Sequence, residues 1–450
     1  MFLNAPAGLL YAGDEGFPEN AKTGLDKQWW NLSPRVGVAW DVRGDGRLAV
    51  RSSYAMAYDF MSGEYHNINA NAPPFGNRSL IVDPTGLFDD PYRDVGGDPH
   101  PITTGPTTEY PRFGTFGTMD PGINSPRIQS WNVTVEQQLG TQWGVSASYL
   151  GSHSDRLWAQ VALNPGVYMG LGRCVINGVT YNVCSTNANL NQRRLLYQQN
   201  PTEAGLIGAL DRNTDIGYQN YRGLKVSAQR RAVGGLNLNG SYTLSRCKGT
   251  PTPTGFSQQS AGYLKPDDPS FDAGYCDQDR THIASLTTGY ETPEFGSPAM
   301  RAIVSHWRLS GIISARSGSR LNITAGRDNA FTGLANQRPN MVSDDFYADE
   351  KTLSQYFNRA AFAQPAAGTL GDLERNAAVG PNFWNVDLAV SRLIAVSATQ
   401  RLELRLESFN LLNHFNWGNP TTNFNAGTFG RITTQAGNPR IMQFGIKYDF

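Results

Sequence analysis

The C-terminal segment Arg440-Ile-Met-Gln-Phe-Gly-Ile-Lys-Tyr-Asp-Phe450 decides the fold class. Taken in steps of two, its side chains form an apolar, partly aromatic row, and the residues between them are polar or small. The apolar row consists of Met442, Phe444, Ile446, Tyr448 and Phe450. Successive side chains of a β-strand point to opposite faces, so the segment predicts a strand with one apolar and one polar face. Its length of about ten residues suits a tilted strand that crosses a bilayer.

The same alternation recurs along the chain, mostly in pairs of segments joined by short turns. The clearest case is 401–407, where Leu402, Leu404 and Leu406 alternate with charged residues. Those charged residues are Arg401, Glu403, Arg405 and Glu407. The predicted strands are 33–41, 48–60, 128–139, 143–151, 220–230, 236–247, 281–291, 302–316, 383–394, 401–412 and 440–450.

The connections between these strands indicate the architecture. Turns of about 3–7 residues alternate with loops of about 26–66 residues, and only 292–301 is a longer turn. A soluble sandwich or propeller has no reason to keep every second connection long, whereas membrane barrels have short periplasmic turns and long extracellular loops. We therefore predict an antiparallel transmembrane β-barrel wall of about 11 strands, with apolar rows toward lipid and the charged ladder toward a polar lumen. In loop 317–380 we expect a short helix near Thr352–Phe357.

Aromatic residues at strand ends fit this architecture, because such residues form belts at membrane interfaces. They are Trp40, Tyr58, Phe60, Trp143, Tyr149, Tyr290, Trp384 and Tyr448.

Composition excludes other classes. With 39% hydrophobic residues and a mean hydropathy of −0.41, the 450-residue chain has no run near the roughly 18 apolar residues of a spanning helix. Lys+Arg and Asp+Glu are both 38, so no net charge favours nucleic acid. Residues 1–11 lack the basic and apolar regions of a signal peptide, so an export signal is expected further upstream.

The four cysteines form one close and one wider pair, each flanking a polar stretch. They are Cys174 and Cys184, then Cys247 and Cys276. Two loop disulfides in an oxidising compartment fit better than a metal site, because there is no CxxC and no neighbouring His pair.

No motif indicates an enzyme, a cofactor or a metal centre. The histidines at 66, 100, 153, 282, 306 and 414 show no HxxxH or HExxH spacing, and GxSxG, P-loop and Rossmann fingerprints are absent. The turn 41–46 resembles half an EF-hand loop but lacks the distal Glu, so we assign it no metal.

Two groups of loop residues are candidate ligand sites. The acidic residues of 267–279 suit Ca²⁺, but a solvated acidic loop closed by Cys247–Cys276 is the favoured interpretation. These residues are Asp267, Asp268, Asp272, Asp277 and Asp279. The loop residues Tyr65, His66, Asn67 and Tyr110 suit sugar or siderophore contacts, and equally suit ordinary loop surface. We therefore assign no ligand-binding residue.

A series of segments resembles the C-terminal part of TonB-dependent outer-membrane receptors of the Oar-like type, which often carry an N-terminal carboxypeptidase-regulatory-like domain. The segments run in the family's order from residue 33 onward. They are 33–41 (SPRVGVAWD), 51–59 (RSSYAMAYD), 130–139 (SWNVTVEQQL), 221–231 (YRGLKVSAQRR), 307–312 (WRLSGI), 380–387 (GPNFWNVD) and 406–414 (LESFNLLNH).

The resemblance implies a 22-stranded barrel with an internal plug, a TonB box and energised uptake of a bulky ligand such as an oligosaccharide or metal chelate. It also implies that the C-terminal strand, with Phe444, Ile446, Tyr448 and Phe450, is read by the barrel-assembly machinery. We expect 1–32 to be a loop remnant of an upstream barrel part and 33–450 to be the C-terminal half of the barrel. The plug, the TonB box and the regulatory-like domain are expected to be absent from this chain, so TonB would act only through the missing N-terminal part.

The expected function is outer-membrane transport, with membrane lipid, the assembly machinery and an unidentified ligand as partners. A passive porin or structural barrel is the alternative, and a secreted carbohydrate-binding β-protein is a weaker one.

Overall fold

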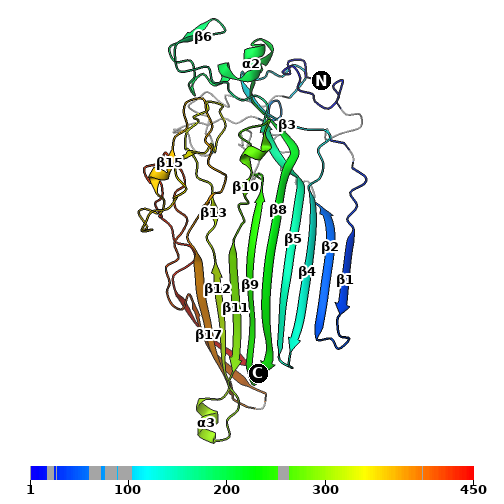
Figure 1. The fold of residues 1–450 in the computed structure, drawn as a ribbon, viewed down its shortest axis with the longest axis vertical. Coiled ribbons are helices and arrows are strands. Elements are labelled where there is room, and N and C mark those ends of the chain that lie inside the picture. The colour runs from blue at the N-terminus through cyan, green and yellow to red at the C-terminus, as the bar shows by residue number, and fades with distance from the viewer. Residues whose placement is uncertain are drawn as a thin grey trace.

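The computed structural model describes residues 2–17, 25–26, 28–59, 72–76, 89, 104–251, 263–397 and 399–450. Within these residues the chain forms one main sheet whose path runs through eleven antiparallel strands, so the all-β class and the strand number are confirmed (Figure 1). The strands are β1 (Arg35–Asp41), β2 (Leu48–Tyr58), β4 (Arg127–Leu139), β5 (Trp143–Ala162), β8 (Ile207–Val233), β9 (Leu236–Gly249), β11 (His282–Glu291), β12 (Trp307–Arg316), β17 (Phe383–Ala395), β18 (Arg401–Phe409) and β19 (Ile441–Asp449).

Short elements occupy the connections. They are β3 (Gly114–Met119), β6 (Cys174–Ile176), β7 (Val179–Tyr181), η2 (Asn191–Arg193), α2 (Leu195–Gln199), η3 (Glu203–Leu206), η4 (Pro269–Asp272), β10 (Gly274–Tyr275), α3 (Pro298–Ile303), β13 (Arg320–Leu321), β14 (Asn340–Met341), η5 (Arg359–Ala361), β15 (Phe362–Ala363) and β16 (Ala378–Val379). None of the described helices has the length and apolarity that crossing a membrane requires.

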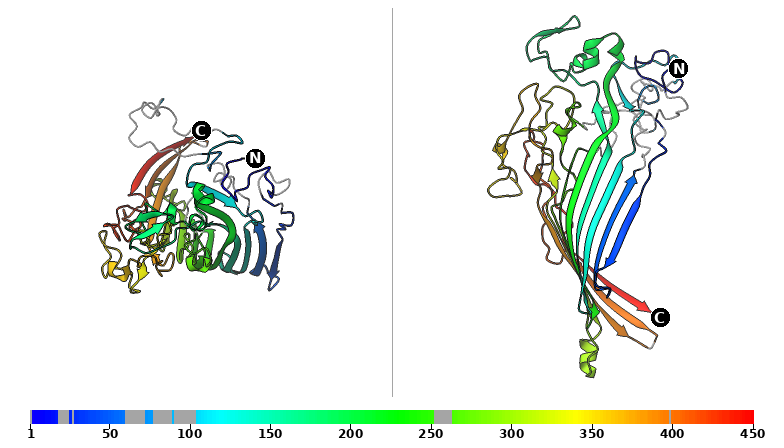
Figure 2. Two further views of the ribbon diagram at one scale, coloured as in Figure 1. Left: turned by 90° about the horizontal axis from the view of Figure 1, so that it is seen from above. Right: turned by 45° about the vertical axis from the view of Figure 1, so that its right-hand side comes forward.

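The eleven strands, here called the barrel wall, curve into an open arc. Figure 2 shows this arc from above, and Figure 1 looks onto its convex face. In the described residues β1 and β19 form the two edges and do not pair with each other. An open sheet edge presents unpaired backbone N–H and C=O groups, which are costly in lipid.

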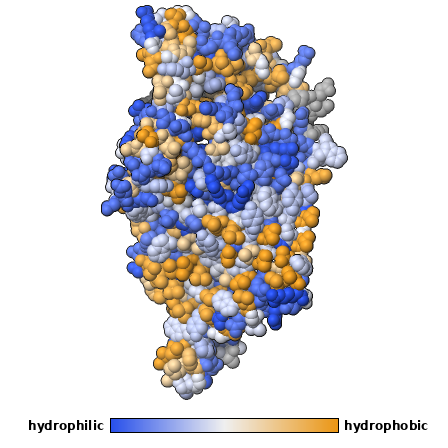
Figure 3. Space-filling model, viewed as in Figure 1, coloured by the Kyte–Doolittle hydropathy of each residue, from blue (hydrophilic) through white to orange (hydrophobic). Residues whose placement is uncertain are grey.

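Strand register places the apolar rows of neighbouring strands on one common face. In the β18–β19 ladder Leu402 lies opposite Tyr448, Leu404 opposite Ile446, and Leu406 opposite Phe444. The charged residues between them point to the concave face. In Figure 3 a hydrophobic zone crosses the lower half of the convex face, below a more hydrophilic zone. The predicted division into an apolar and a polar face is therefore confirmed.

The two ends of the wall differ as predicted. Short turns lie at the lower end of Figure 1 and the long loops at the upper end. Two strands reach beyond their neighbours toward the long loops: β8 has 27 residues, roughly 90 Å of extended chain, and β5 has 20.

Three sequence expectations about these strands are wrong. The strands predicted at 143–151 and 220–230 are both longer than expected, because β5 and β8 continue to pair through Ala162 and Asp211. The connection between them therefore shortens to 163–206. This extension is buried on both faces at its end, so it lacks the alternation that marks a strand. The connection between the strands predicted at 48–60 and 128–139 also contains a strand, β3, which pairs in parallel with β8.

Two expectations about helices are also wrong. The strand expected to begin at 302 begins at Trp307, because α3 occupies the preceding turn, with the Ser297 side chain accepting a hydrogen bond from Met300 N. The helix expected at Thr352–Phe357 is absent, because the N–H of Tyr356 donates to Gly430 O in another loop rather than within a helical turn.

The long loops pack on one another and form a folded layer. We call the described residues of 163–206, 248–281, 317–382 and 410–440 the loop assembly. Its largest hydrophobic core joins the last two loops, with Ile323 and Phe357 each 1% exposed and Phe429 stacked on Phe357 at 5.5 Å. The long loops are therefore an internally packed unit above the barrel wall.

Candidate functional site

The concave face carries rows of charged side chains, which suit contact with water or with a polar plug domain. Arg405 pairs with Glu407 at 2.5 Å on β18, and Lys447 pairs with Asp449 at 2.9 Å on β19. At the other side of the arc, Arg51 on β2 pairs with Glu136 on β4 at 3.0 Å. These residues are exposed, apart from the half-buried Glu407, and they are paired along or across strands, so the concave face suits a polar passage rather than a hydrophobic core.

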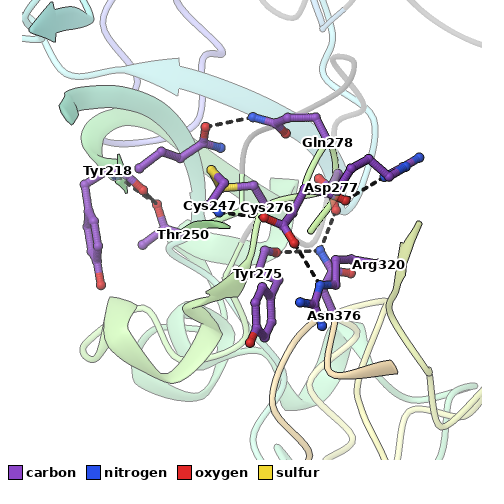
Figure 4. The surroundings of a disulfide bond; sticks show 12 residues. Tyr218, Cys247, Thr250, Tyr275, Cys276, Asp277, Gln278, Arg320 and Asn376 are labelled. Carbon is purple, nitrogen blue, oxygen red and sulfur yellow. Dashed lines mark hydrogen bonds and ion pairs between the residues drawn. A yellow bond between two sulfur atoms is a disulfide. The ribbon is translucent and has the colours of Figure 1, made fainter. Parts of the chain in front are cut away.

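Above the wall, three Arg–Asp pairs join loop 248–281 to loop 317–382. Their N–O distances are 2.5 Å for Arg338–Asp272, 2.7 Å for Arg375–Asp277 and 2.9 Å for Arg320–Asp279. Figure 4 shows Asp277, Asn376 and Arg320 gathered around Tyr275 beside the Cys247–Cys276 disulfide.

The first of these pairs is the most buried. The side chains of Arg338 and Asp272 are 3% and 2% exposed. Arg338 also donates to Leu373 O at 2.7 Å and to Phe271 O at 2.9 Å, and Asp272 accepts from Leu264 N at 2.7 Å. A buried ion pair that is also fully hydrogen-bonded costs much to break, because removing one partner leaves the other charge unpaired.

These contacts correct part of the expectation of a solvated acidic loop: Asp267, Asp268 and Asp277 are exposed as expected, but Asp272 and Asp279 are buried. Asp272 is 1% exposed and Asp279 is 3% exposed, and Asp277 receives Arg375 and Asn376. The guanidinium groups of Arg338, Arg320 and Arg375 supply the positive charge that a bound metal cation would otherwise provide. Among the described residues no group of three His, Cys, Asp or Glu is arranged to hold a metal ion.

One disulfide lies within the loop assembly, and a second joins the assembly to the end of a wall strand. Cys174 is bonded to Cys184 across the β6–β7 hairpin, and Cys247 at the upper end of β9 is bonded to Cys276. Asp279 accepts a hydrogen bond from Cys247 N at 2.6 Å, and Cys276 N donates to Cys247 O at 3.1 Å. The second disulfide thus closes the loop that the arginines hold.

A buried arginine joins the first disulfide loop to loop 317–382. Arg193 is 0% exposed, and burial lowers the pKa of its guanidinium. It donates to Val167 O, Thr186 O and Asn189 Oδ1 within its own loop, and to Phe331 O at 3.0 Å in the other. Three of these hydrogen bonds thus order the arginine's own loop and the fourth joins that loop to 317–382, and none of the four acceptors is a carboxylate.

Two clefts open between the loops. The aromatic cleft holds about 600 Å³ on the convex side, where Trp384 stacks on His414 at 4.1 Å and Lys351 lies over Tyr347. The amide cleft holds about 480 Å³ between three loops. Its polar lining consists of Asn187, Thr324, Arg327, Asp328, Asn336, Gln337 and Asn423. Amides and one exposed arginine suit a ligand rich in hydroxyl or anionic oxygen groups.

The residues considered as sugar or siderophore contacts fare differently. Tyr65, His66 and Asn67 lie outside the described residues. Tyr110 is 8% exposed and packs near Phe116 and Tyr11, so it belongs to a small core rather than to an open surface.

Sequence reasoning missed the residues that organise the loops. The one available signal is at Arg338, which is the only charged residue between Asp328 and Asp344. Arg193, Arg320 and Arg375 stand near other charged residues and carried no such signal. Their partners were not readable, since Asp272 and Arg338 are 66 residues apart in the chain.

Comparison with protein families gives a match over residues 1–443 to a model described as "Outer membrane beta barrel domain". Comparison with curated proteins gives no match.

Solved structures with a similar fold include the outer-membrane transporter YddB from Escherichia coli, at 11% identity and a TM-score of 0.46. This chain is also similar to the FrpB iron transporter from Neisseria meningitidis, with 13% identity and a TM-score of 0.40. It is similar as well to the ferric preacinetobactin receptor BauA from Acinetobacter baumannii, with 12% identity and a TM-score of 0.40. Each match covers 93% of this chain, but only 41%, 39% and 36% of those chains, respectively.

Proposed function

This chain belongs to the outer-membrane β-barrel domain family, and we propose that it supplies wall and extracellular loops to a TonB-dependent transport receptor of the Oar-like type. The proposed activity is uptake of a bulky ligand, such as an oligosaccharide or a metal chelate, energised through TonB. Further strands complete the barrel in this proposal, because the wall is an open arc with two unpaired edges.

The observation that carries the proposal is that ion pairs hold the loop assembly together above a polar concave face. A passive pore has no need of a buried ion pair such as Arg338–Asp272 between two outer loops. A receptor gains from it, because a preformed binding surface loses less conformational entropy when the ligand binds. The amide cleft is the proposed place of ligand contact within this assembly.

Conductance of the full-length gene product in planar lipid bilayers tests the proposal. A receptor whose barrel is plugged shows no large steady conductance, whereas a passive porin shows one without any ligand. Large open-channel steps from the unmodified protein would contradict the receptor and favour the porin. The same preparation, with its plug segment deleted, is the positive control for a correctly inserted barrel.

We also propose that the C-terminal strand is an assembly signal, with Phe450 as its terminal residue. Phe444, Ile446 and Phe450 are 81%, 76% and 95% exposed, although Tyr448 and Phe450 stack at 6.1 Å. Deleting Phe450 should lower the amount of barrel inserted in the outer membrane, as measured by heat-modifiable gel mobility. Deleting the exposed side chain of Leu412, by Leu412→Ala, is a control and should leave insertion unchanged. Equal insertion of both variants would contradict the signal.

A further inference from the structure

Two arginines face outward side by side on the convex surface. In the β8–β9 ladder Arg222 lies directly opposite Arg246, and both side chains are exposed. Like charges directly opposite each other destabilise a sheet. Within the described residues neither guanidinium has a carboxylate partner, and Arg246 contacts the Tyr275 ring at 5.2 Å. This is an uncompensated double positive charge.

The pair lies at the upper border of the apolar band. The next outward residues below it are Leu224 and Leu244, which are 46% and 44% exposed. Arg230 marks the opposite end of the apolar stretch of β8. At a rise of about 3.3 Å per residue and a tilt of about 40°, the segment between Arg222 and Arg230 covers roughly 20 Å of membrane thickness. The pair is therefore at headgroup level, on the long-loop side.

The indole ring of Trp131 lies beside the arginine pair. Gly151 on β5 lies opposite Arg222, and Trp131 on β4 lies opposite Gly151. A Cβ on Gly151 would come within 2.3 Å of the Trp131 indole, so the ring lies across the glycine toward β8. Aromatic side chains at this level are typical of the membrane interface.

Other charges in this region are already paired. Lys248, the next outward residue of β9, binds Glu374 at 2.5 Å. Asp155, on the neighbouring β5, is paired with Arg127. The carboxylates of Glu374 and Asp155 are therefore already engaged by other cations.

We propose that Arg222 and Arg246 bind a phosphate of an outer-leaflet lipid headgroup. Long loops face outside the cell in barrels of this kind, so the pair meets the outer leaflet. The planar guanidinium donates two parallel hydrogen bonds to phosphate, and one anion between the two forks turns their repulsion into attraction. The assignment rests on the family's membrane location and not on the identity of any transported ligand.

Lipid binding to the full-length protein in non-ionic detergent tests this assignment. The probe is diphosphoryl lipid A, compared with the same lipid after its phosphates are removed. The variants R222Q and R246Q should each weaken binding about fivefold, and the double variant about 25-fold, because each arginine near a charged headgroup contributes about 1 kcal/mol. R230Q, at the opposite border of the band, is the matched control and should bind like the parent.

Thermal unfolding provides a second readout that a folding defect cannot mimic. In neutral micelles R246Q should raise the unfolding temperature slightly, because cross-strand repulsion is removed. With diphosphoryl lipid A present, the same variant should unfold at a lower temperature than the parent, because the parent alone gains the bound anion.

Three outcomes would overturn the assignment. The double variant could bind lipid A within twofold of the parent. The dephosphorylated lipid could bind as tightly as the phosphorylated one. Inorganic phosphate alone could bind as tightly as the lipid, which would make the pair a site for a soluble anion.

Discussion

The barrel wall and the loop assembly are stable for opposite reasons. Every residue of β19 is exposed, and the wall is held by backbone ladders whose side chains face lipid or a polar interior. In the loop assembly Ile323 and Phe357 are 1% exposed, and Arg338 is buried with its carboxylate partner. The wall thus depends on the membrane and on neighbouring strands, whereas the loop assembly carries its own core. Changes in one should leave the other largely intact.

Arg338→Ala is expected to give the largest difference between the effect on the loop assembly and the effect on the barrel wall. Removing this arginine leaves Asp272 as an unpaired buried charge, which costs about 3–5 kcal/mol. Limited proteolysis should then cut within 263–281 or 317–382, while heat-modifiable mobility of the barrel is kept. Glu407→Gln breaks an exposed pair on the wall and is the matched control, with an effect of about 0.2–1 kcal/mol. Loss of the inserted barrel in Arg338→Ala would show that the regions are not independent.

Reduction of the Cys247–Cys276 disulfide should also affect the loop assembly more than the barrel wall, by a smaller amount. It closes a loop of sequence separation 29, so reduction should destabilise the loop assembly by roughly 3–4 kcal/mol at most. The expected result is faster hydrogen exchange in 263–281 after reduction, with β17 and β18 unchanged. Non-reducing peptide mapping should first show links 174–184 and 247–276. Free thiols in protein recovered from the cell surface would refute the pairing that we predict.

The smallest effect is expected where the two regions meet, at Asp211 near the upper end of β8. Burial raises the pKa of this carboxyl from 3.8 to about 6, although Arg194 opposes the shift. The folded state therefore holds the proton more tightly than the unfolded state. Ionised Asp211 costs stability above about pH 6, and the cost disappears as pH falls toward 4.

Hydrogen exchange of 207–214 measures this pH dependence. Protection should be greater at pH 5 than at pH 7.5 after correction for intrinsic exchange. Asp211→Asn should flatten the profile, and Asp215→Asn, which removes a carboxylate bonded to Asn124, should not. An unchanged profile in Asp211→Asn would exclude this carboxyl as the cause.

The wall could be predicted because its rule is local. Alternation at 401–407 and 440–450 placed the faces of β18 and β19 without knowledge of any distant residue. The rule failed at the end of β5, where Trp158 to Ala162 are all buried and neither face is exposed. The helix α3 was readable in retrospect, since Ser297-Pro298 is a typical N-cap followed by proline at the first helical position.

The loop assembly could not be predicted because its contacts are distant in sequence. Arg193 reaches Phe331 across 138 residues, and Arg375 reaches Asp277 across 98. A charge in a loop is consistent with solvent exposure until its partner is known. For the acidic loop 267–279 the sequence therefore favoured a solvated surface, which is correct for Asp267, Asp268 and Asp277. At Asp272 and Asp279 the fold places guanidinium groups where the sequence predicts water.

Arg193 and Arg338 hold the outer loops together, and this has a kinetic consequence for any ligand that binds there. Loops that are already packed need not fold around an arriving molecule, so association should run at the ordinary rate for a rigid surface. Affinity differences between competing ligands would then be expressed mainly as residence time. Sequence drift in these loops that preserves the arginines would change how long a ligand stays rather than how fast it arrives.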